Sequence, residues 1–554
     1  MSKTRILIFY GIFAIGFLLL VGRLFELQII FGTKNKILAE GNRIKKIVNP
    51  APRGMIYDRN EKELVRNVPI YRIKNTECRM PARQASPGEA GGENGECWQT
   101  ISREEALRLE ARGETENLRM DIGRDYLYGR SLAHVLGYLS EANPQEVEEG
   151  RWEMGDLVGR TGVEEKYDAL LRGKDGGELI EVDSLGNKVR EIGKIEPVPG
   201  KDIHLSVDGE LSKVAWEALG DRPGAVVANE VKTGQVLVLV SSPSFNPNQI
   251  SEQDLTNPGL PFFNRAISGA YPPGSTFKIV TTTAGVEEGK VNENTTFEDP
   301  GEIRIGEYVY KNWYFTQYGK TEGTINLVRA IKRSTDTFFY KVGEWVGATT
   351  LAEWARVFGL GRKEGIDIPG EVAGLVPDPG WKEKTTGERW FLGDTYHFAI
   401  GQGDLLATPL QINIMTSIIA NDGLLCRPRV KEQAFVPSSG RGESGRAGEC
   451  QDLKLKPETL RLIKEGMKEA CSPGGTAFPL FDFKPQVGCK TGTAEFGDPA
   501  GRTHAWLTAF APSPDGSGQV PEIVVTALVE GGGEGSYIAA PIVKKVMEAW
   551  FHGR

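Results

Sequence analysis

Apolar residues form a long run near the N-terminus of the chain. The segment Ile6–Gly22 (ILIFYGIFAIGFLLLVG) carries no charge, and after one arginine the apolar pattern resumes and continues to Phe31. A helix of this length and composition can cross a bilayer. The pattern therefore predicts a transmembrane anchor over residues 6–30.

The charges beside this run predict its orientation. Lys3 and Arg5 precede it, and positive charge near a membrane span favours the cytoplasmic side, so residues 1–5 are expected in the cytoplasm. A cleaved signal peptide is the alternative, but Arg23-Leu-Phe-Glu26 follows the run where a small-x-small cleavage site would stand. We expect a retained single-pass anchor in the cell (inner) membrane, with the later chain extracytoplasmic.

The second half of the chain shows both strand and helix periodicity. Strands are predicted over residues 202–208, 224–240 (two strands around a Lys-Thr-Gly turn), 505–510 and 523–529. Helical spacing appears over residues 211–219 and, as an amphipathic terminal helix, from about 541 to 551. This order predicts an α+β fold, in which an antiparallel sheet is flanked by helices and carries an inserted helical subdomain.

The first half after the anchor has fewer regular segments. Residues 79–97 have the composition of a surface insertion, and Val182-Asp-Ser-Leu-Gly186 predicts a hairpin. The composition changes near Pro197-Val-Pro-Gly200. We therefore expect one domain over residues 45–200 and another over residues 201–554.

Composition excludes some classes of function. The chain has 554 residues, enough for two or three domains, with 40% hydrophobic and 25% charged residues. Its net charge of −8 argues against nucleic acid as a partner, because nucleic-acid binders present a basic face. With only five histidines, a histidine-rich metal site is not expected.

The cysteines fit an exported chain. The six fall into three sequential pairs: Cys78 with Cys97, Cys426 with Cys450, and Cys471 with Cys489. The first two pairs bracket glycine-rich polar loops, which suits disulfides in an oxidising compartment. Other connectivities and free buried thiols remain open, whereas zinc is disfavoured because no C-x-x-C motif accompanies the cysteines.

A candidate nucleophile lies in Pro273-Gly-Ser-Thr-Phe-Lys278. On a helix, Ser275 and Lys278 lie on one face, within hydrogen-bond reach of each other. A lysine in a dry pocket can lose its proton and activate a serine hydroxyl. The preceding Pro-Pro-Gly would place Ser275 at a helix N-terminus, where backbone N–H groups can stabilise an oxyanion. An isolated S-x-x-K is nevertheless a weak signal.

Two later segments could complete such a site. Ser334-Thr-Asp336 offers a second hydroxyl, and Lys490-Thr-Gly-Thr493 offers a positive charge, two hydroxyls and a glycine that lets a substrate approach the strand. Each has an ordinary structural alternative: Ser334 as a helix N-cap and Lys490 as a solvated strand residue. A second Lys-Thr-Gly, at residues 232–234, shows that the triplet alone proves little.

The three segments follow the order of the S-x-x-K, S-D-N and K-T-G set of penicillin-binding proteins, with Ser334-Thr-Asp336 replacing the middle motif and Asp336 standing in place of Asn. The chain resembles a class B penicillin-binding protein, a membrane-anchored peptidoglycan D,D-transpeptidase. Matching motifs extend beyond the three segments: Arg53–Asn60, Ala133–Tyr138, Gly159–Glu164, Asn264–Ala266, Gly401–Gly403 and Thr408–Gln411. The resemblance implies that residues 45–200 form a non-catalytic pedestal (dimerisation-like) domain and residues 201–554 the transpeptidase domain.

The resemblance also implies roles for the site residues. Ser275 would be acylated by a stem peptide or a β-lactam, with Lys278 as the base and Ser334 as a proton shuttle. Lys490, Thr491, Gly492 and Thr493 would hold the terminal carboxylate, and the backbone N–H groups of Ser275 and Thr493 would form the oxyanion hole. Asp336 is expected among the substrate-binding residues, although its carboxylate only accepts hydrogen bonds when ionised.

Within the family, Ser-Thr-Asp followed by Phe338-Phe-Tyr340, together with Phe391–Thr395, is similar to the elongation-type penicillin-binding protein 2 group. Some of its members carry a zinc site with Cys and His between the first two motifs. Residues 279–333 contain neither residue type, so no metal and no other cofactor is expected.

The resemblance leaves alternatives and partners to be considered. A D,D-carboxypeptidase or a division-type transpeptidase uses the same site, whereas a β-lactamase needs neither anchor nor pedestal. A β-lactam sensor would carry several membrane spans. The expected partners are peptidoglycan stem peptides, β-lactams, a SEDS-family glycan polymerase in the membrane and other elongation-complex proteins.

Overall fold

A computed structural model describes residues 3–33, 44–75, 97–114, 118–152, 155–182, 188–432, 450–513 and 520–553. The chain divides into two compact units. The first unit consists of Met1–Gly54, Met120–Ile122 and Ala169–Lys201, and the second of Met55–Arg119, Gly123–Asp168 and Asp202–Arg554. The last and longest segment of the second unit therefore begins at Asp202, next to the composition change near residue 200.

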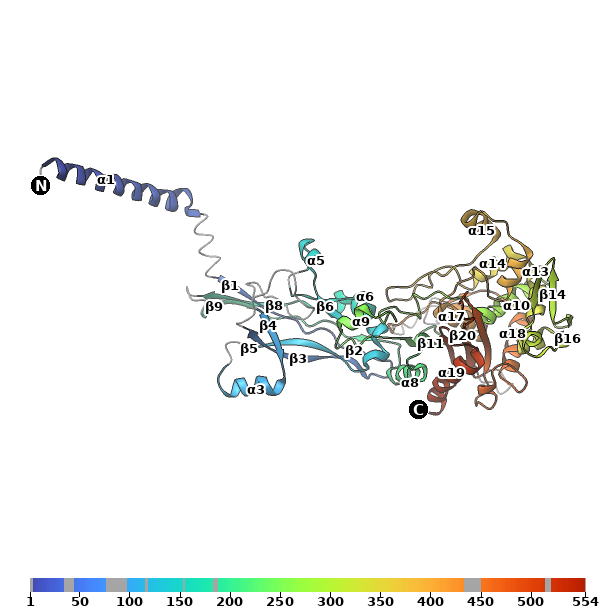
Figure 1. Ribbon diagram of the computed structural model, residues 1–554. Coiled ribbons are helices and arrows are strands. Elements are labelled where there is room, and N and C mark those ends of the chain that lie inside the picture. The colour runs from blue at the N-terminus through green and yellow to red at the C-terminus, as the bar shows by residue number, and fades with distance from the viewer. Residues whose placement is uncertain are drawn as a thin grey trace, which may run out of the picture. The chain divides into compact units, whose positions relative to one another are not determined.

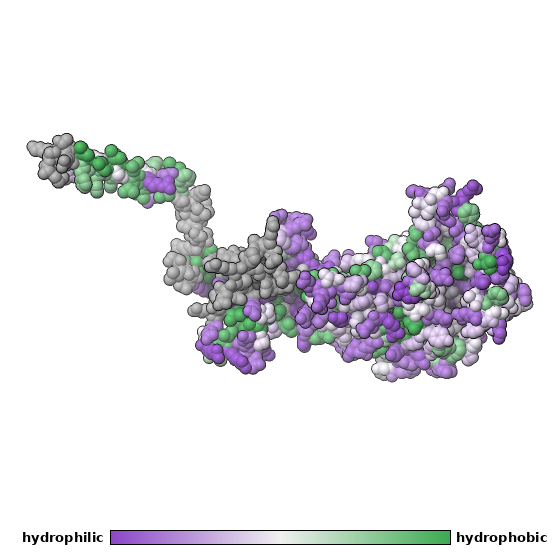
Figure 2. All heavy atoms as spheres, in the orientation of Figure 1, coloured by the Kyte–Doolittle hydropathy of each residue, from purple (hydrophilic) through white to green (hydrophobic). Residues whose placement is uncertain are grey.

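The first unit begins with the apolar helix α1 (Lys3–Phe25), which continues as a π-helical turn, η1 (Glu26–Ile30) (Figure 1). The segment Ile8–Ile30 is long and apolar enough to cross a membrane, and none of its most apolar window is buried. Figure 2 shows apolar residues along the described surface of α1. A helix with this exposed apolar surface is compatible with a single-pass membrane anchor.

The rest of the first unit is a small antiparallel sheet with the order β1-β8-β9. Its strands are β1 (Ile44–Asn49), β8 (Gly176–Val182) and β9 (Lys188–Ile195). Antiparallel pairing of β8 with β9 agrees with the predicted hairpin. Its turn lies outside the described residues.

The second unit starts with a sheet in which β10, β2, β3 and β4 are successive neighbours and β5 also pairs with β3. The strands are β2 (Ile56–Tyr57), β3 (Glu63–Asn75), β4 (Cys97–Ile101), β5 (Leu118–Tyr126) and β10 (Ile203–His204). The prediction of a strand over residues 202–208 is wrong in extent. The backbone leaves this sheet because the N–H of Ser206 bonds to Val430 and that of Asp208 to Leu237.

The larger sheet of this unit is antiparallel, with the order β12-β11-β21-β20-β19. Its strands are β11 (Gly224–Glu230), β12 (Val236–Ser242), β19 (Gly488–Glu495), β20 (Thr503–Ala511) and β21 (Ile523–Val529). Nearly all residues of β11, β12 and β21 are buried, because helices cover both faces. The predicted α+β fold and its principal strands are confirmed.

Helices α8 (Gly209–Leu219) and α19 (Gly535–His552) cover one face of this sheet, with the main apolar core between them and the strands. The opposite face contacts α17 (Pro409–Ala420), all of whose residues are buried. Thr408 caps α17, Pro409 occupies its first turn, and Gln411 completes a capping box. The Thr-Pro-Leu-Gln motif of the sequence is therefore a helix start.

The terminal helix begins earlier than predicted. The amphipathic pattern predicted a start at about Pro541, and proline suits a first helical turn. In the structure α19 begins at Gly535, because Ala539 and Ala540 are buried in the core and hold an additional turn against the sheet. The early start brings Gly535 beside β19: a Cβ at this position would lie 2.5 Å from the Gly492 carbonyl oxygen.

A helical subdomain stands between β12 and β19. Its main helices are α10 (Lys278–Glu287), α12 (Leu327–Arg333), α13 (Asp336–Val346), α14 (Ala348–Val357), α16 (Leu392–Ala399) and α18 (Pro457–Ala470). Between α10 and α12 lie β13 (Thr296–Asp299), β14 (Glu302–Ile305), β15 (Tyr308–Lys311), α11 (Trp313–Tyr318) and β16 (Gly323–Asn326). This inserted segment pairs as β13 with β16 and β14 with β15.

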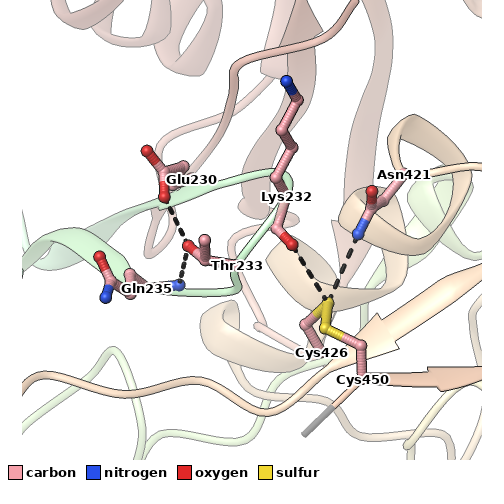
Figure 3. The surroundings of a disulfide bond; sticks show 7 residues. All are labelled: Glu230, Lys232, Thr233, Gln235, Asn421, Cys426 and Cys450. Atoms are coloured by element: carbon pink, nitrogen blue, oxygen red, sulfur yellow. Dashed lines mark hydrogen bonds between the residues drawn. A yellow bond between two sulfur atoms is a disulfide. The ribbon is translucent and has the colours of Figure 1, made fainter. Parts of the chain in front are cut away.

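Figure 3 shows that the first Lys-Thr-Gly, residues 232–234, is a turn beside the disulfide between Cys426 and Cys450. The hydroxyl of Thr233 donates to Glu230 at 2.6 Å and accepts from the backbone N–H of Gln235 at 3.2 Å. A Cβ on Gly234 would lie 2.8 Å from that of Cys426. The first triplet therefore has a local structural role in joining β11 to β12.

We expect replacement of both Cys426 and Cys450 by serine to destabilise the second unit by about 3 kcal/mol, because the unfolded chain regains the freedom of the closed loop. The thermal unfolding midpoint of the detergent-solubilised full chain should fall by several degrees. Covalent labelling by a fluorescent penicillin below the unfolding range would show that the active fold persists. An unchanged midpoint would contradict this prediction.

Candidate active site

Ser275 lies in η3 (Gly274–Phe277), a 3-10 turn that leads directly into α10. The α-helix itself starts at Lys278, later than the sequence suggested, because Gly274 adopts φ 55° and turns the chain sharply. A Cβ on Gly274 would lie 3.1 Å from the Thr493 carbonyl oxygen. Glycine thus lets the turn bearing Ser275 approach β19 closely.

Lys278 points into the protein, where its side chain has no exposed area. Its Nζ donates to the Ser334 carbonyl oxygen at 2.8 Å, to Ser334 Oγ at 3.1 Å and to Asp336 Oδ1 at 2.6 Å. The ring of Phe339 lies beneath the same amine, 5.2 Å from Nζ to the ring centroid. The first and second predicted segments therefore meet at Lys278.

Ser334 adopts a conformation that is uncommon for a residue with a side chain. It ends α12 in the left-handed region, with φ 55° and ψ 39°, so the alternative that it is a helix N-cap is wrong. Such a conformation costs of order 1 kcal/mol and persists only where the surroundings enforce it. It directs the hydroxyl to Lys278 and also to Lys490, whose Nζ lies 2.8 Å from Ser334 Oγ.

Lys490 is fully buried on β19, so the alternative of a solvated strand residue is wrong as well. Its Nζ also donates to the Thr491 carbonyl oxygen at 3.0 Å. Burial lowers the pKa of Lys490 well below its usual range, and the nearby Lys278 lowers it further, while Asp336 opposes the shift. Burial likewise lowers the pKa of Lys278, again against the effect of Asp336.

This arrangement places two amines and one carboxylate in a dry site. Two ammonium groups within about 3 Å of the same hydroxyl would repel each other strongly, which favours a neutral form for one lysine. A serine hydroxyl can accept from a charged amine while it donates to a neutral one. The proximity of the two amines therefore favours a neutral form for one of them, and a general base must be neutral.

The remaining residues of the third segment lie along β19, which is an edge strand of the sheet. Gly492 packs against η3, since a Cβ there would lie 3.0 Å from the Pro273 carbonyl oxygen. Thr491 Oγ1 donates to Thr476 Oγ1 at 2.9 Å, and Thr493, which is exposed, accepts from the backbone N–H of Gly535 at 3.4 Å. An edge strand with an exposed hydroxyl, here that of Thr493, can receive an extended peptide.

The Asp336 carboxylate is occupied by groups of the chain. Oδ1 accepts from Lys278, and Oδ2 accepts from the backbone N–H of Trp313 at 3.0 Å. Its side chain is 12% exposed, in contrast to the accessible Thr493. Both oxygens of the Asp336 carboxylate are thus bonded within the chain, which does not favour the role in substrate binding expected for this residue.

Four of the cysteines form two disulfides. Cys471, just after α18, is bonded to Cys489, the residue before Lys490, and Cys426 is bonded to Cys450. Cys78 and the side chain of Cys97 lie outside the described residues. Within the described part of the chain, no group of three or more His, Cys, Asp or Glu side chains is placed to hold a metal ion.

Several residues near the site were not identified from the sequence. Thr476 and Gly535 contact β19 from segments with no motif of their own, and Trp506 Nε1 on β20 donates to the Pro272 carbonyl oxygen at 3.0 Å. No local pattern marks them, because each is defined only by proximity to the three motifs. The left-handed backbone conformation of Ser334 could not be predicted either, because nothing in the neighbouring sequence requires it.

Comparisons with known proteins identify the family of the chain. Residues 224–548 match the family model of the penicillin-binding protein transpeptidase domain, and residues 92–205 match that of the penicillin-binding protein dimerisation domain. The peptidoglycan D,D-transpeptidase MrdA of Acinetobacter baumannii is 31% identical, with 99% of this chain and 87% of the relative covered. MrdA of Escherichia coli K12 is 30% identical, with 96% and 92% covered.

Solved structures give the same result. A chain of a peptidoglycan synthase complex that coordinates polymerisation and crosslinking superposes with a TM-score of 0.77 at 31% identity, covering 100% of this chain and 99% of that one. Penicillin-binding protein 2 of Helicobacter pylori, in its complex with MreC, has a TM-score of 0.77 at 28% identity, with 92% and 98% covered. The chain therefore belongs to the class B penicillin-binding proteins, in the elongation-type penicillin-binding protein 2 group of peptidoglycan D,D-transpeptidases.

Proposed function

We propose that this transpeptidase cross-links peptidoglycan stem peptides through an acyl-enzyme on Ser275. The observation that carries the assignment is that Lys278 and Lys490 both contact the hydroxyl of Ser334. Lys278 directly follows the turn that bears Ser275. Residues of three distant segments converge there, and the lowered pKa of Lys278 favours its action as a base.

In the first step, neutral Lys278 would accept the proton of the Ser275 hydroxyl as Oγ attacks the carbonyl carbon of the penultimate D-Ala. The backbone N–H groups of Ser275 and Thr493 would stabilise the oxyanion. Collapse of this intermediate breaks the peptide bond, and the leaving amine of the terminal D-Ala takes a proton through Ser334. The hydroxyl of Ser334 contacts both lysines, so it can pass a proton on from either amine.

In the second step, the amine of another stem peptide would attack the ester on Ser275 and form the cross-link. Its proton returns through the same residues, and Ser275 is released. Thr491, Thr493 and Lys490 would hold the terminal carboxylate of the donor peptide. A β-lactam would acylate Ser275 in the same way, but its leaving amine stays attached in the opened ring.

Asp336 has a different role in this scheme. The Asp336 carboxylate accepts hydrogen bonds from Lys278 and from the backbone N–H of Trp313. We therefore propose that Asp336 positions Lys278 and stabilises its protonated form, rather than contacting substrate. A negative charge beside Lys278 favours the protonated amine. Asp336 therefore orients the base while it opposes the effect of burial.

The wider setting follows from the chain's organisation. Residues 6–30 would anchor the protein, with residues 1–5 cytoplasmic and both domains outside; Lys3 and Arg5 support this orientation. Residues 45–200 would form the pedestal and residues 201–554 the catalytic domain. The solved complexes of relatives support elongation-complex partners, and we propose a SEDS-family polymerase in the membrane as the source of the glycan strands.

We expect Ser275→Ala to abolish covalent labelling by a fluorescent penicillin, because no oxygen remains to form the ester. Gel fluorescence of membranes containing the full chain measures this directly. The matched control is Ser472→Ala, which removes a hydroxyl that only donates to the Lys468 carbonyl and should label like the unaltered chain. Persistent labelling of the Ser275 variant would reject the nucleophile, and absence of labelling in every chain would reject the function.

Asp336→Asn should move the pH dependence of acylation to lower pH. Acylation needs neutral Lys278, so its rate rises with pH through the pKa of this lysine. Removing the adjacent negative charge lowers that pKa further, so the rise should occur at a lower pH. The measurement is the second-order rate constant for labelling of the full chain across the pH range in which it stays folded.

The control for this experiment is Asp422→Asn, which removes a carboxylate from an exposed ion pair with Lys464. Its pH profile should coincide with that of the unaltered chain. A profile for Asp336→Asn that stays in place, or moves to higher pH, would contradict the assigned role of Asp336.

A further inference from the structure

The Asp299 carboxylate lies buried at the end of β13 and accepts four hydrogen bonds. Oδ1 accepts from the Gly301 N–H at 2.9 Å and the Thr337 hydroxyl at 2.6 Å. Oδ2 accepts from Asn312 Nδ2 at 3.0 Å and the Glu322 N–H at 2.9 Å. Every one of these donors is neutral, and they come from separate points of the chain. One carboxylate therefore joins the inserted segment between α10 and α12 to the start of α13.

Asn312 extends this connection towards the catalytic lysine. Its side chain has no exposed area, and its Oδ1 accepts the backbone N–H of Asp336 at 3.2 Å while its Nδ2 donates to Asp299. The next residue, Trp313, donates its backbone N–H to Asp336 Oδ2. The position of Asn312 thus determines where both the backbone and the carboxylate of Asp336 are held.

Asp299 also holds Asp336 from its other side, through Thr337. Asn312 and Thr337 both donate to Asp299. Asn312 accepts the backbone N–H of Asp336, and Thr337 is the next residue in the chain. Asp336 in turn lies 2.6 Å from Lys278 Nζ. A continuous series of buried hydrogen bonds therefore runs from Asp299 through Asn312 and Asp336 to the amine of Lys278.

The inserted segment holds Ser334 in a comparable way. Glu322, whose side chain is 3% exposed, accepts from Arg333 Nε at 2.7 Å, and Trp313 Nε1 donates to the Arg333 carbonyl oxygen at 2.8 Å. Arg333 directly precedes Ser334 and its left-handed backbone. The second motif is thus fixed on both sides by residues of the insertion.

We propose that Asp299 is a positioning residue for acyl transfer, which acts through Asn312 and Asp336 on the placement and protonation of Lys278. The inference rests on the proposed function, because it assigns Lys278 as the base. Charged acceptors bind neutral donors more strongly than amide oxygens do, so a carboxylate at this position holds the network more rigidly than an amide would. A small displacement of a base lowers the rate disproportionately.

The test is Asp299→Asn in the full chain, measured as the second-order rate constant of labelling by a fluorescent penicillin against pH. The new amide would direct an N–H group at existing donors and loosen Asp336. We expect the plateau rate to fall about tenfold or more. We also expect the rise of the profile to move to lower pH, as for Asp336→Asn, because the carboxylate is held less closely against Lys278.

The same substitution in an Asp336→Asn background separates positioning from general destabilisation. If Asp299 acts through Asp336, it should cause no further movement of the pH profile there. The matched control is Glu298→Gln, the same change of charge one residue earlier on the exposed side of β13, and it should leave the profile unchanged. Thr337→Val, which removes one donor to Asp299, should produce a smaller shift in the same direction and serves if the Asp299 variant does not accumulate.

A wild-type profile for Asp299→Asn, or for Thr337→Val where only that variant accumulates, would overturn the proposal. So would a lower rate with an unmoved profile, which indicates only a loss of folded protein, or an equal shift in both backgrounds. These outcomes differ from failure of the proposed function, in which the unaltered chain itself does not label.

Discussion

The structure of the site depends on the contact of two buried lysines with one serine hydroxyl. Lys278 and Lys490 both lie within about 3 Å of Ser334 Oγ, and neither has exposed side-chain area. Two unscreened ammonium groups are unfavourable at this separation, and leaving charge in a dry interior costs several kcal/mol per ion. The same burial lowers the pKa of both amines and so favours a neutral amine, the form that activation of a serine requires. Burial of the two lysines therefore both costs free energy and favours the neutral amine.

The fold supplies this burial from two directions. The antiparallel sheet, covered by α8 and α19 on one face and α17 on the other, presents Lys490 from its edge strand β19. The helical subdomain presents Lys278 at the start of α10 and Ser334 between α12 and α13. Gly274 and Gly492 permit the close approach of these two parts, because a side chain at either position would meet backbone atoms of the other part. Two of the glycines in the motifs are thus explained by contact between sheet and helices.

The insertion between α10 and α12 holds the backbone around Ser334 in place. Asp299 and Glu322, both buried carboxylates, connect it to the residues on either side of Ser334. A non-glycine residue in the left-handed region needs such surroundings, because its backbone would otherwise relax to a more favourable conformation. The precise placement of Ser334 therefore depends on contacts outside all three motifs.

The sequence by itself determined the N-terminal apolar helix, the main strands and the residue types of the candidate site. Apolar runs and alternation are local properties that follow from solvation and backbone geometry, and S-x-x-K with K-T-G carries its chemistry in the side chains. Tertiary structure decided which residues act together. It separated Lys490-Thr-Gly492 on an edge strand from Lys232-Thr-Gly234, a turn beside a disulfide. It also directed Asp336 to Lys278 and brought Asp299 into the network. The physical reason is that hydrogen bonds between distant segments depend on packing across the whole domain, which no local pattern encodes.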